Sequence, residues 1–127
     1  MKVVIADDSS SIRIKLSRYL RDLGHEIVGE AVNGLEALKL VQSKSPDLVT
    51  LDLVMPEMDG LSALRCIRAE NKNVLVIMVS SAATIANEKT AKEAGADAFL
   101  RKPFDKRSLE KTISEVSTKK SPNERAA

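Results

Sequence analysis

The chain has 127 residues, of which 43% are hydrophobic and 30% are charged, as is typical of one globular domain. Its 20 basic and 18 acidic residues give a net charge of +2, which is too balanced to favour nucleic-acid binding, and it has no Trp and few aromatic rings for stacking on bases. No apolar run reaches the roughly 18 residues that span a membrane, no signal peptide is evident, and the single cysteine cannot form an internal disulfide. We therefore expect one domain in the reducing cytoplasm.

The first half of the chain is predicted to form two strand–helix units. The apolar run VVIA starts near residue 2, and a shorter, more polar run starts near residue 26, as expected for a strand at the edge of a sheet. Serines at 9–11 and Gly24 mark the start and the end of the first helix, and Asn33 with Glu36 forms a capping box for the second. The apolar stripes of these helices are Ile12, Leu16, Leu20 and Leu23, and Leu35, Leu38 and Val41.

The second half adds three further units and a polar end. The runs LVTL and VLVIMV are continuous rather than alternating, as in strands covered on both faces, whereas the run near residue 98 is short and suits an edge. The Ala-rich segment 84–95 is weakly amphipathic, so we expect a short, poorly anchored fourth helix. Apolar periodicity ends near residue 117, which predicts a domain over 1–117 and a disordered tail over 118–127. The other two helical stripes are Leu61, Leu64 and Ile67, and Leu109, Ile113 and Val116.

The order of the predicted elements is βαβαβαβαβα. Such alternation favours an α/β fold, a doubly wound five-stranded parallel sheet with helices on both faces and right-handed crossovers. In such a sheet the carboxyl ends of the strands face one crevice, where ligands bind. Residues at those ends are therefore the first candidates for a functional site.

Polar residues end four of the five apolar runs. Asp7 and Asp8 close the first run, Asp52 the third, Ser80 the fourth and Lys102 the fifth. Crowded carboxylates repel one another unless a cation shares the site, and oxygen ligands without His or Cys suit Mg²⁺ or Mn²⁺. A cation, a carboxylate nucleophile, a hydroxyl and a lysine describe phosphoryl transfer. Asp52 would attack phosphorus, the metal and Lys102 would balance charge on the phosphoryl oxygens, and Ser80 would hydrogen-bond one of them.

These motifs, in this order and spacing, resemble those of the receiver domain of bacterial two-component response regulators, particularly the stand-alone chemotaxis CheY type. The resemblance covers about residues 2–116. It rests on the pair Asp7-Asp8, the segment LDLVMPEMDG around Asp52, VSS at Ser80, and Lys102-Pro103-Phe104. It implies a (βα)5 flavodoxin-like fold with strand order 2-1-3-4-5 and a cis Lys102–Pro103 peptide bond.

The resemblance also implies how the site works. Asp52 would accept a phosphoryl group from a phosphohistidine on a sensor kinase, so that the chain is a phosphoprotein of phosphorelay signal transduction. Asp8, Asp52 and the backbone carbonyl of Val54 would bind Mg²⁺ directly, and Asp7 would contribute mainly through water. The protein would catalyse only its own phosphorylation and dephosphorylation and would not be an enzyme that turns over external substrates.

A two-residue switch is implied as well. Ser80 would move toward the phosphoryl group, and Phe99 would rotate inward into the vacated space. This biases a pre-existing equilibrium and reshapes the face of the fourth helix, fifth strand and fifth helix, where a downstream protein docks. We expect a monomer that binds neither nucleic acid nor membranes, and the sequence identifies neither the kinase nor the target.

Three alternatives follow from the same residues. A Mg²⁺-dependent phosphatase with an aspartyl-phosphate intermediate usually needs an acid/base Asp two positions after the nucleophile, where Val54 stands, and a cap for which no insertion exists. An FMN electron carrier needs a neutral, donor-rich first turn, whereas DDSSS is acidic. The chain is also compatible with a receiver cut from a longer response regulator.

Overall fold

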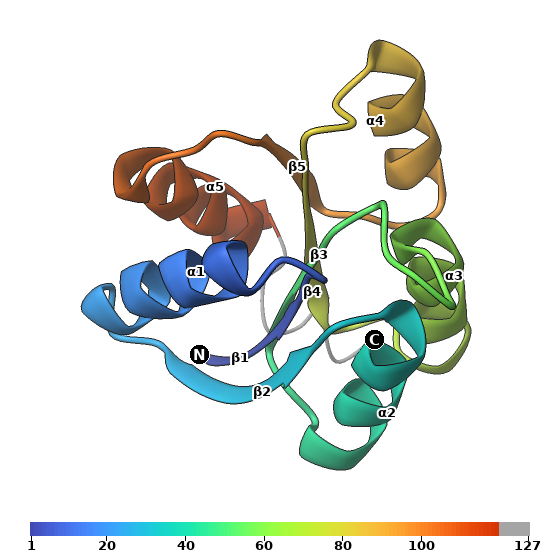
Figure 1. Ribbon diagram of the computed structural model, residues 1–127, viewed down its shortest axis with the longest axis horizontal. Helices are drawn as coiled ribbons and strands as arrows, with labels where there is room; N and C mark the ends of the chain where they lie inside the picture. Colours follow the sequence, from blue (N-terminus) through green and yellow to red (C-terminus); the bar gives the residue numbers. More distant parts are fainter. Residues whose placement is uncertain (120–127) are drawn as a thin grey trace.

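The computed structural model describes residues 1–119, in which strands and helices alternate from end to end (Figure 1). The strands are β1 (Lys2–Ala6), β2 (Glu26–Ala31), β3 (Leu48–Leu51), β4 (Leu75–Ser80) and β5 (Ala98–Arg101). The helices are α1 (Ser10–Asp22), α2 (Gly34–Lys44), α3 (Gly60–Glu70), α4 (Ile85–Glu93) and α5 (Lys106–Lys119). Each strand begins within one residue of the position expected from the apolar runs.

The five strands form one parallel sheet in the order β2-β1-β3-β4-β5. In the centre, β1 pairs with β3 from Val3–Leu48 to Ala6–Leu51, and β3 pairs with β4 from Leu48–Leu75 to Leu51–Met78. The two edge strands, β2 and β5, are the ones whose polarity predicted that position. The predicted fold class and strand order are confirmed.

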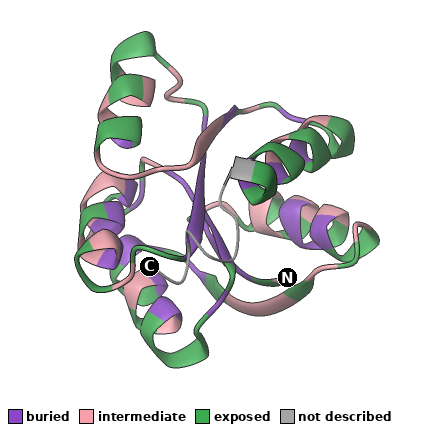
Figure 2. Ribbon diagram, turned by 180° about the vertical axis from the view of Figure 1, so that it is seen from behind, coloured by how far each residue is buried: buried purple, intermediate pink, exposed green. Residues whose placement is uncertain are grey.

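Helices cover both faces of this sheet, with α1 and α5 on one side and α2, α3 and α4 on the other (Figures 1 and 2). Successive strand residues point to opposite faces, so each strand contributes to two cores. Every residue of β3 and β4 is buried, as the continuous apolar runs predicted. The core under α1 and α5 includes Val3, Ile5, Leu16, Leu20, Leu48, Ile77 and Leu109; the core under the other helices includes Val4, Val49, Leu64, Ile67 and Met78.

The helix ends follow the sequence signals closely. Asn33 caps α2 by accepting a hydrogen bond from the Glu36 amide at 2.8 Å, and the Glu36 carboxylate accepts from the Val32 amide at 3.2 Å. Helix α4 has nine residues and a single buried one, Ala91, in line with its weak amphipathic pattern.

The last helix differs slightly from expectation. α5 continues to Lys119, two residues beyond the end of the apolar stripe. The rest of the expected tail, 120–127, lies outside the described residues. Within 1–119, no helix has both the length and the apolar character needed to cross a membrane.

Candidate functional site

Backbone hydrogen bonds carry the strand pairing beyond the strand ends and so place the candidate residues at one edge of the sheet. The Asp7 amide donates to the Ala31 carbonyl at 3.0 Å, and the Asp52 amide donates to the Ala6 carbonyl at 3.0 Å. The Lys102 amide donates to the Ser80 carbonyl at 3.1 Å. Asp7 and Lys102 thereby meet although 95 positions separate them in the sequence. This edge is the carboxyl end of the sheet, where open α/β sheets bind ligands.

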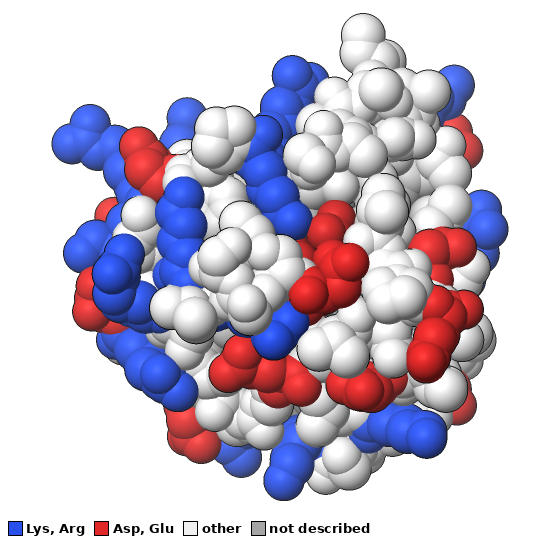
Figure 3. Space-filling model, viewed as in Figure 1, with Lys and Arg blue, Asp and Glu red and all other residues white. Residues whose placement is uncertain are grey.

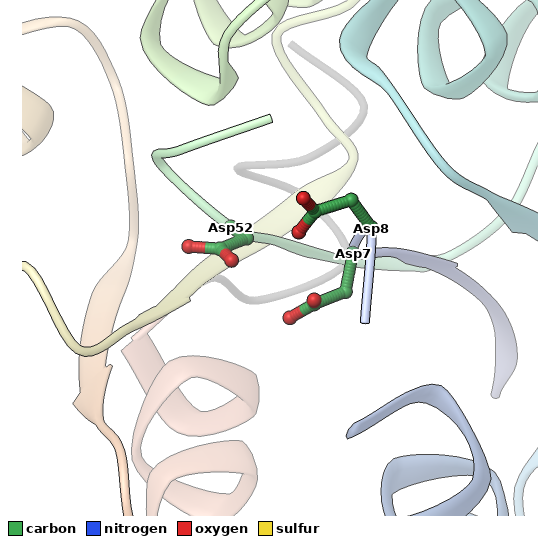
Figure 4. Close-up of side chains that lie close together, drawn as sticks. All are labelled: Asp7, Asp8 and Asp52. Carbon is green, nitrogen blue, oxygen red and sulfur yellow. The ribbon is translucent and has the colours of Figure 1, made fainter. Parts of the chain in front are cut away.

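Three carboxylates from the ends of β1 and β3 lie side by side at this edge (Figure 4). One oxygen from each of Asp7, Asp8 and Asp52 lies within 4.8 Å of the others. Asp7 and Asp52 are buried, at 1% and 6% exposure, whereas Asp8 is exposed. The predicted acidic group is therefore real, with two members inside the protein and one open to solvent.

Lys102 joins the two buried carboxylates. Its Nζ donates hydrogen bonds to Asp7 Oδ2 at 2.7 Å and to Asp52 Oδ2 at 3.0 Å, and its side chain is 14% exposed. Charge-assisted bonds of this length are the stronger kind. One ammonium nevertheless faces three carboxylates, so negative charge remains in excess at the site (Figure 3).

The pKa values of Asp7 and Lys102 are both shifted at this site. Burial raises the pKa of Asp7 above its usual range, because the hydrogen bonds from Lys102 and the Ser9 amide offset the burial only in part and Asp52 adds repulsion. Burial alone would lower the pKa of Lys102, but its hydrogen bonds to Asp7 and Asp52 and their charges raise it above its usual value. Lys102 is thus held firmly charged, while ionised Asp7 is destabilised by its surroundings.

The donor set fits a hard divalent cation. All three side chains offer carboxylate oxygens, which Mg²⁺ and Mn²⁺ prefer, and the excess negative charge favours a cation. The segment that follows Asp52 adds backbone groups beside these oxygens, since the Val54 amide lies 3.4 Å from Asp52 Oδ1. Val54 itself is 66% exposed.

Ser80 and Phe99 lie on adjacent strands and on the same face of the sheet. Phe99 pairs with Met78, and Ser80 is two residues beyond Met78, so strand alternation turns both toward the α2–α3–α4 side. Ser80 is 1% exposed, and its Oγ accepts a hydrogen bond from the Ala82 amide at 3.1 Å. Phe99 is half-buried and lines a recess of about 280 Å³ between α4, β5 and α5, together with Ala91 and Thr112.

The structure also shows features that sequence reasoning missed. Gly60 lies so close to the backbone of Asp52 that an added Cβ would clash with the Asp52 carbonyl. The only sequence signal for this contact is the glycine itself, at the start of a helix where Ala would otherwise be favoured.

The peptide bond between Lys102 and Pro103 is cis, which confirms the prediction made from the family resemblance.

Basic side chains surround one side of the acidic centre. Figure 3 shows acidic residues gathered in the middle of the face and Lys and Arg spread over α1 and α5.

The Nζ of Lys15, in α1, lies 4.6 Å from the ring centroid of Phe104, the residue that follows Pro103. This cation–π contact joins α1 to the segment that carries Lys102.

Comparison with known proteins identifies relatives of this fold and site. The family description "Response regulator receiver domain" matches residues 3–114. The chain is 42% identical over 104 residues to the chemotaxis protein CheY of Listeria monocytogenes, covering 82% of this chain and 87% of that protein. It is 41% identical over 103 residues to the transcriptional regulatory protein PdtaR of Mycobacterium tuberculosis, covering 81% of this chain and 50% of that protein.

A solved structure agrees with these sequence relatives. The crystal structure of the CheX–CheY–BeF3–Mg²⁺ complex from Borrelia burgdorferi contains a chain that superposes with a TM-score of 0.89 at 32% identity. The match covers 91% of this chain and 88% of that one. The similarity thus extends through all the elements that build the acidic site.

Proposed function

The chain belongs to the response regulator receiver domain family, whose members are phosphorylation-activated signalling switches, and we propose that Asp52 is the residue through which this switch is operated. The observation that carries the proposal is the contact of Asp52 with Lys102 at 3.0 Å inside the group of three carboxylates. Neither the phosphatase nor the FMN electron carrier is favoured by these relatives. The donor of the phosphoryl group is a phosphohistidine on a sensor kinase.

The reaction is a displacement at phosphorus. A carboxylate oxygen of Asp52 forms a bond to phosphorus, and the bond from phosphorus to the histidine nitrogen of the donor breaks. The leaving imidazole takes up a proton, and the product on Asp52 is an acyl phosphate. Lys102 already contacts the attacking carboxylate, so its ammonium is in place to balance the charge of the incoming oxygens.

The metal ligands in this proposal are Asp8, Asp52 and the backbone carbonyl of Val54, with Asp7 acting mainly through water. A bound Mg²⁺, or Mn²⁺, supplies positive charge to the phosphoryl oxygens. The burial of Asp7 and the exposure of Asp8 support this division, because the exposed carboxylate is free to turn toward an ion. Asp7 in turn holds Lys102 beside Asp52.

Ser80 and Phe99 form the switch. The Ser80 hydroxyl accepts from the Ala82 amide, so its own proton can be donated to a phosphoryl oxygen. Movement of Ser80 leaves space on the face that it shares with Phe99, and inward rotation of Phe99 changes the recess between α4, β5 and α5. That face is the proposed docking surface for a downstream protein.

The remaining parts of the proposal concern the whole chain. The receiver domain, predicted over 1–117, extends to the end of α5 at Lys119 and acts as a monomer in the cytoplasm. The protein catalyses only its own phosphorylation and dephosphorylation. Its output is chemotaxis or another pathway controlled by docking, as the similarity to CheY of Listeria monocytogenes supports.

The test uses a small-molecule phosphodonor with Mg²⁺ and intact mass spectrometry. Wild type is expected to gain one phosphoryl group, and Asp52→Asn is expected to gain none. Equal labelling of both proteins would contradict the assignment of Asp52. Omission of Mg²⁺ from the wild-type reaction is the matched control for the metal, and it is expected to suppress labelling strongly.

A further inference from the structure

Asn33 makes two contacts at once, one within its own helix and one with a distant loop. Its Oδ1 accepts from the Glu36 amide at 2.8 Å and caps α2. Its Nδ2 donates to Glu57 Oε2 at 3.1 Å, across 24 positions of sequence. The oxygen and the nitrogen of the Asn33 side-chain amide thus each have a protein partner. Asn33 is only 6% exposed, so water has little access to this group.

The backbones of the same two segments also touch. The Gly34 amide donates to the Met58 carbonyl at 2.8 Å, and a Cβ added to Gly34 would lie 2.5 Å from that carbonyl oxygen. The start of α2 therefore fits directly against the loop 53–59 between β3 and α3. Only glycine permits this approach, so the contact depends on the Asn33-Gly34 pair as a unit.

Glu57 has an unusual backbone conformation in this loop. Its φ is 64°, in the left-handed region that a residue with a Cβ rarely adopts. Residues persist in such conformations only where surrounding contacts hold them. The contact with Asn33 acts on the side chain of this strained residue, and the Gly34 contact acts on its neighbour Met58.

The loop held in this way is the one that leaves the acidic site. It starts directly after Asp52, and the Gly60 amide donates to the Leu53 carbonyl at 2.9 Å, which closes the loop at its far end. Val54 lies in its first turn, with its amide 3.4 Å from Asp52 Oδ1. Val54 thus lies in a loop that is held by the Gly60 contact on one side and by the Asn33 contact on the other.

We propose that Asn33 and Glu57 are positioning residues for the metal site: their hydrogen bond holds loop 53–59 so that the Val54 carbonyl faces the ion. Neither residue contacts the ion itself. The inference rests on the proposed function, because it requires the ion to lie at Asp8 and Asp52. It adds a link between α2 and the metal that the acidic residues alone do not provide.

The test swaps the donor and the acceptor of the hydrogen bond between residues 33 and 57. Asn33→Asp keeps the oxygen that caps α2, and Asp is an equally good N-cap, but it places a second carboxylate against Glu57. Glu57→Gln keeps an oxygen as acceptor for Asn33. The double variant Asn33→Asp/Glu57→Gln restores a donor facing an acceptor and has the same net charge as wild type.

The readout is the dissociation constant of Mn²⁺, measured by calorimetry on the unphosphorylated protein, with thermal unfolding of the metal-free protein alongside. We expect Asn33→Asp to weaken binding on the order of tenfold, the lower end of the range for groups that orient metal ligands. This loss would oppose the general effect of its added negative charge, which attracts cations. The double variant is expected to recover most of the affinity, and Glu57→Gln alone is expected to remain near wild type.

The outcomes separate this inference from the proposed function. If Asn33→Asp binds Mn²⁺ as tightly as wild type, or if it only lowers the unfolding temperature, the positioning role is wrong and the metal site stands. If the double variant fails to recover affinity, the hydrogen bond is not the link. If wild type itself does not bind Mn²⁺, the proposed metal site fails first.

Discussion

Lys102 donates a 2.7 Å hydrogen bond to Asp7, although 95 positions separate the two residues in the sequence. They are the first and the last of the acidic and basic residues that form the site. The same ammonium reaches Asp52 at 3.0 Å. Lys102 therefore holds the two buried carboxylates together in the unphosphorylated protein. We infer that Lys102 is the counter-ion of the acidic site, in addition to the role proposed for it in phosphoryl transfer.

Replacement of Lys102 by Met is predicted to destabilise the metal-free protein. Two nearly buried carboxylates would be left facing each other, which we expect to lower the free energy of unfolding by about 2 kcal/mol. This is less than for a fully buried pair, because Asp7 can take up a proton. Urea unfolding with and without Mg²⁺ measures the effect, and Mg²⁺ is expected to restore part of the loss. Unchanged stability without metal would contradict the counter-ion role.

The same ion pairs predict how stability depends on alkaline pH. The pKa of Lys102 is raised on folding, so the folded protein holds this proton more tightly than the unfolded chain. The stabilisation is fully present below the ordinary lysine pKa of about 10.4 and is lost as pH rises through the raised value. Above a pH of about 10.4, the free energy of unfolding of the wild type should therefore fall more steeply with pH than that of Lys102→Met. Parallel curves for the two proteins would show that the ion pairs contribute little.

Replacement of Asp8 by Asn is predicted to separate metal binding from stability. Asp8 is exposed, and its side chain shows no hydrogen bond within the described part of the chain, so the metal-free free energy of unfolding should change by less than about 0.5 kcal/mol. Mn²⁺ affinity should fall by roughly tenfold or more, because a carboxylate ligand is lost. Calorimetry and urea unfolding on the same samples provide both values. Retained affinity would remove Asp8 from the ligand set.

Thr50 offers a test of the core beneath the site. Its side chain is 1% exposed, and its Oγ1 has no hydrogen-bond partner among residues 1–119. By strand alternation it lies on the same face as Asp52, two positions earlier. Val has nearly the same shape and no hydroxyl, so Thr50→Val is expected to raise the free energy of unfolding by about 1 kcal/mol.

Thr50→Ala serves as the control for this prediction. It also removes the hydroxyl but leaves a small void, so it should lower the free energy of unfolding relative to Thr50→Val. A loss of stability in Thr50→Val itself would mean that the hydroxyl makes a hydrogen bond that stabilises the folded protein.

Much of the fold follows from the sequence because the apolar runs are unambiguous. VVIA, LVTL and VLVIMV are short and continuous, which favours strands covered on both faces, and their polar ends predicted where Asp52 and Ser80 lie. The end of α5 was less predictable, because Thr118 and Lys119 continue the helix without adding to its apolar stripe. The strand order came from the resemblance, since periodicity alone does not specify which strands are neighbours.

The parts of the site that sequence could not predict are contacts between segments. The pairing of Lys102 with Asp7 depends on where a long, flexible side chain settles, and its residue type indicates only a positive charge. The bond from Asn33 to Glu57 joins two loops whose sequence signals are local, a helix cap and a turn. Such contacts need the backbone geometry of both partners, which appears only in the folded structure.

The central claim is that the phosphoryl group is carried by Asp52, and the most direct measurement locates the acyl phosphate itself. The phosphorylated protein is treated with hydroxylamine, which converts an acyl phosphate into a hydroxamate, and the modified residue is then identified by peptide mass spectrometry. We predict a single hydroxamate, on Asp52, that forms only after treatment with phosphodonor and Mg²⁺. A hydroxamate on Asp7 or Asp8 instead, or a phosphorylated peptide that lacks residue 52, would contradict this account.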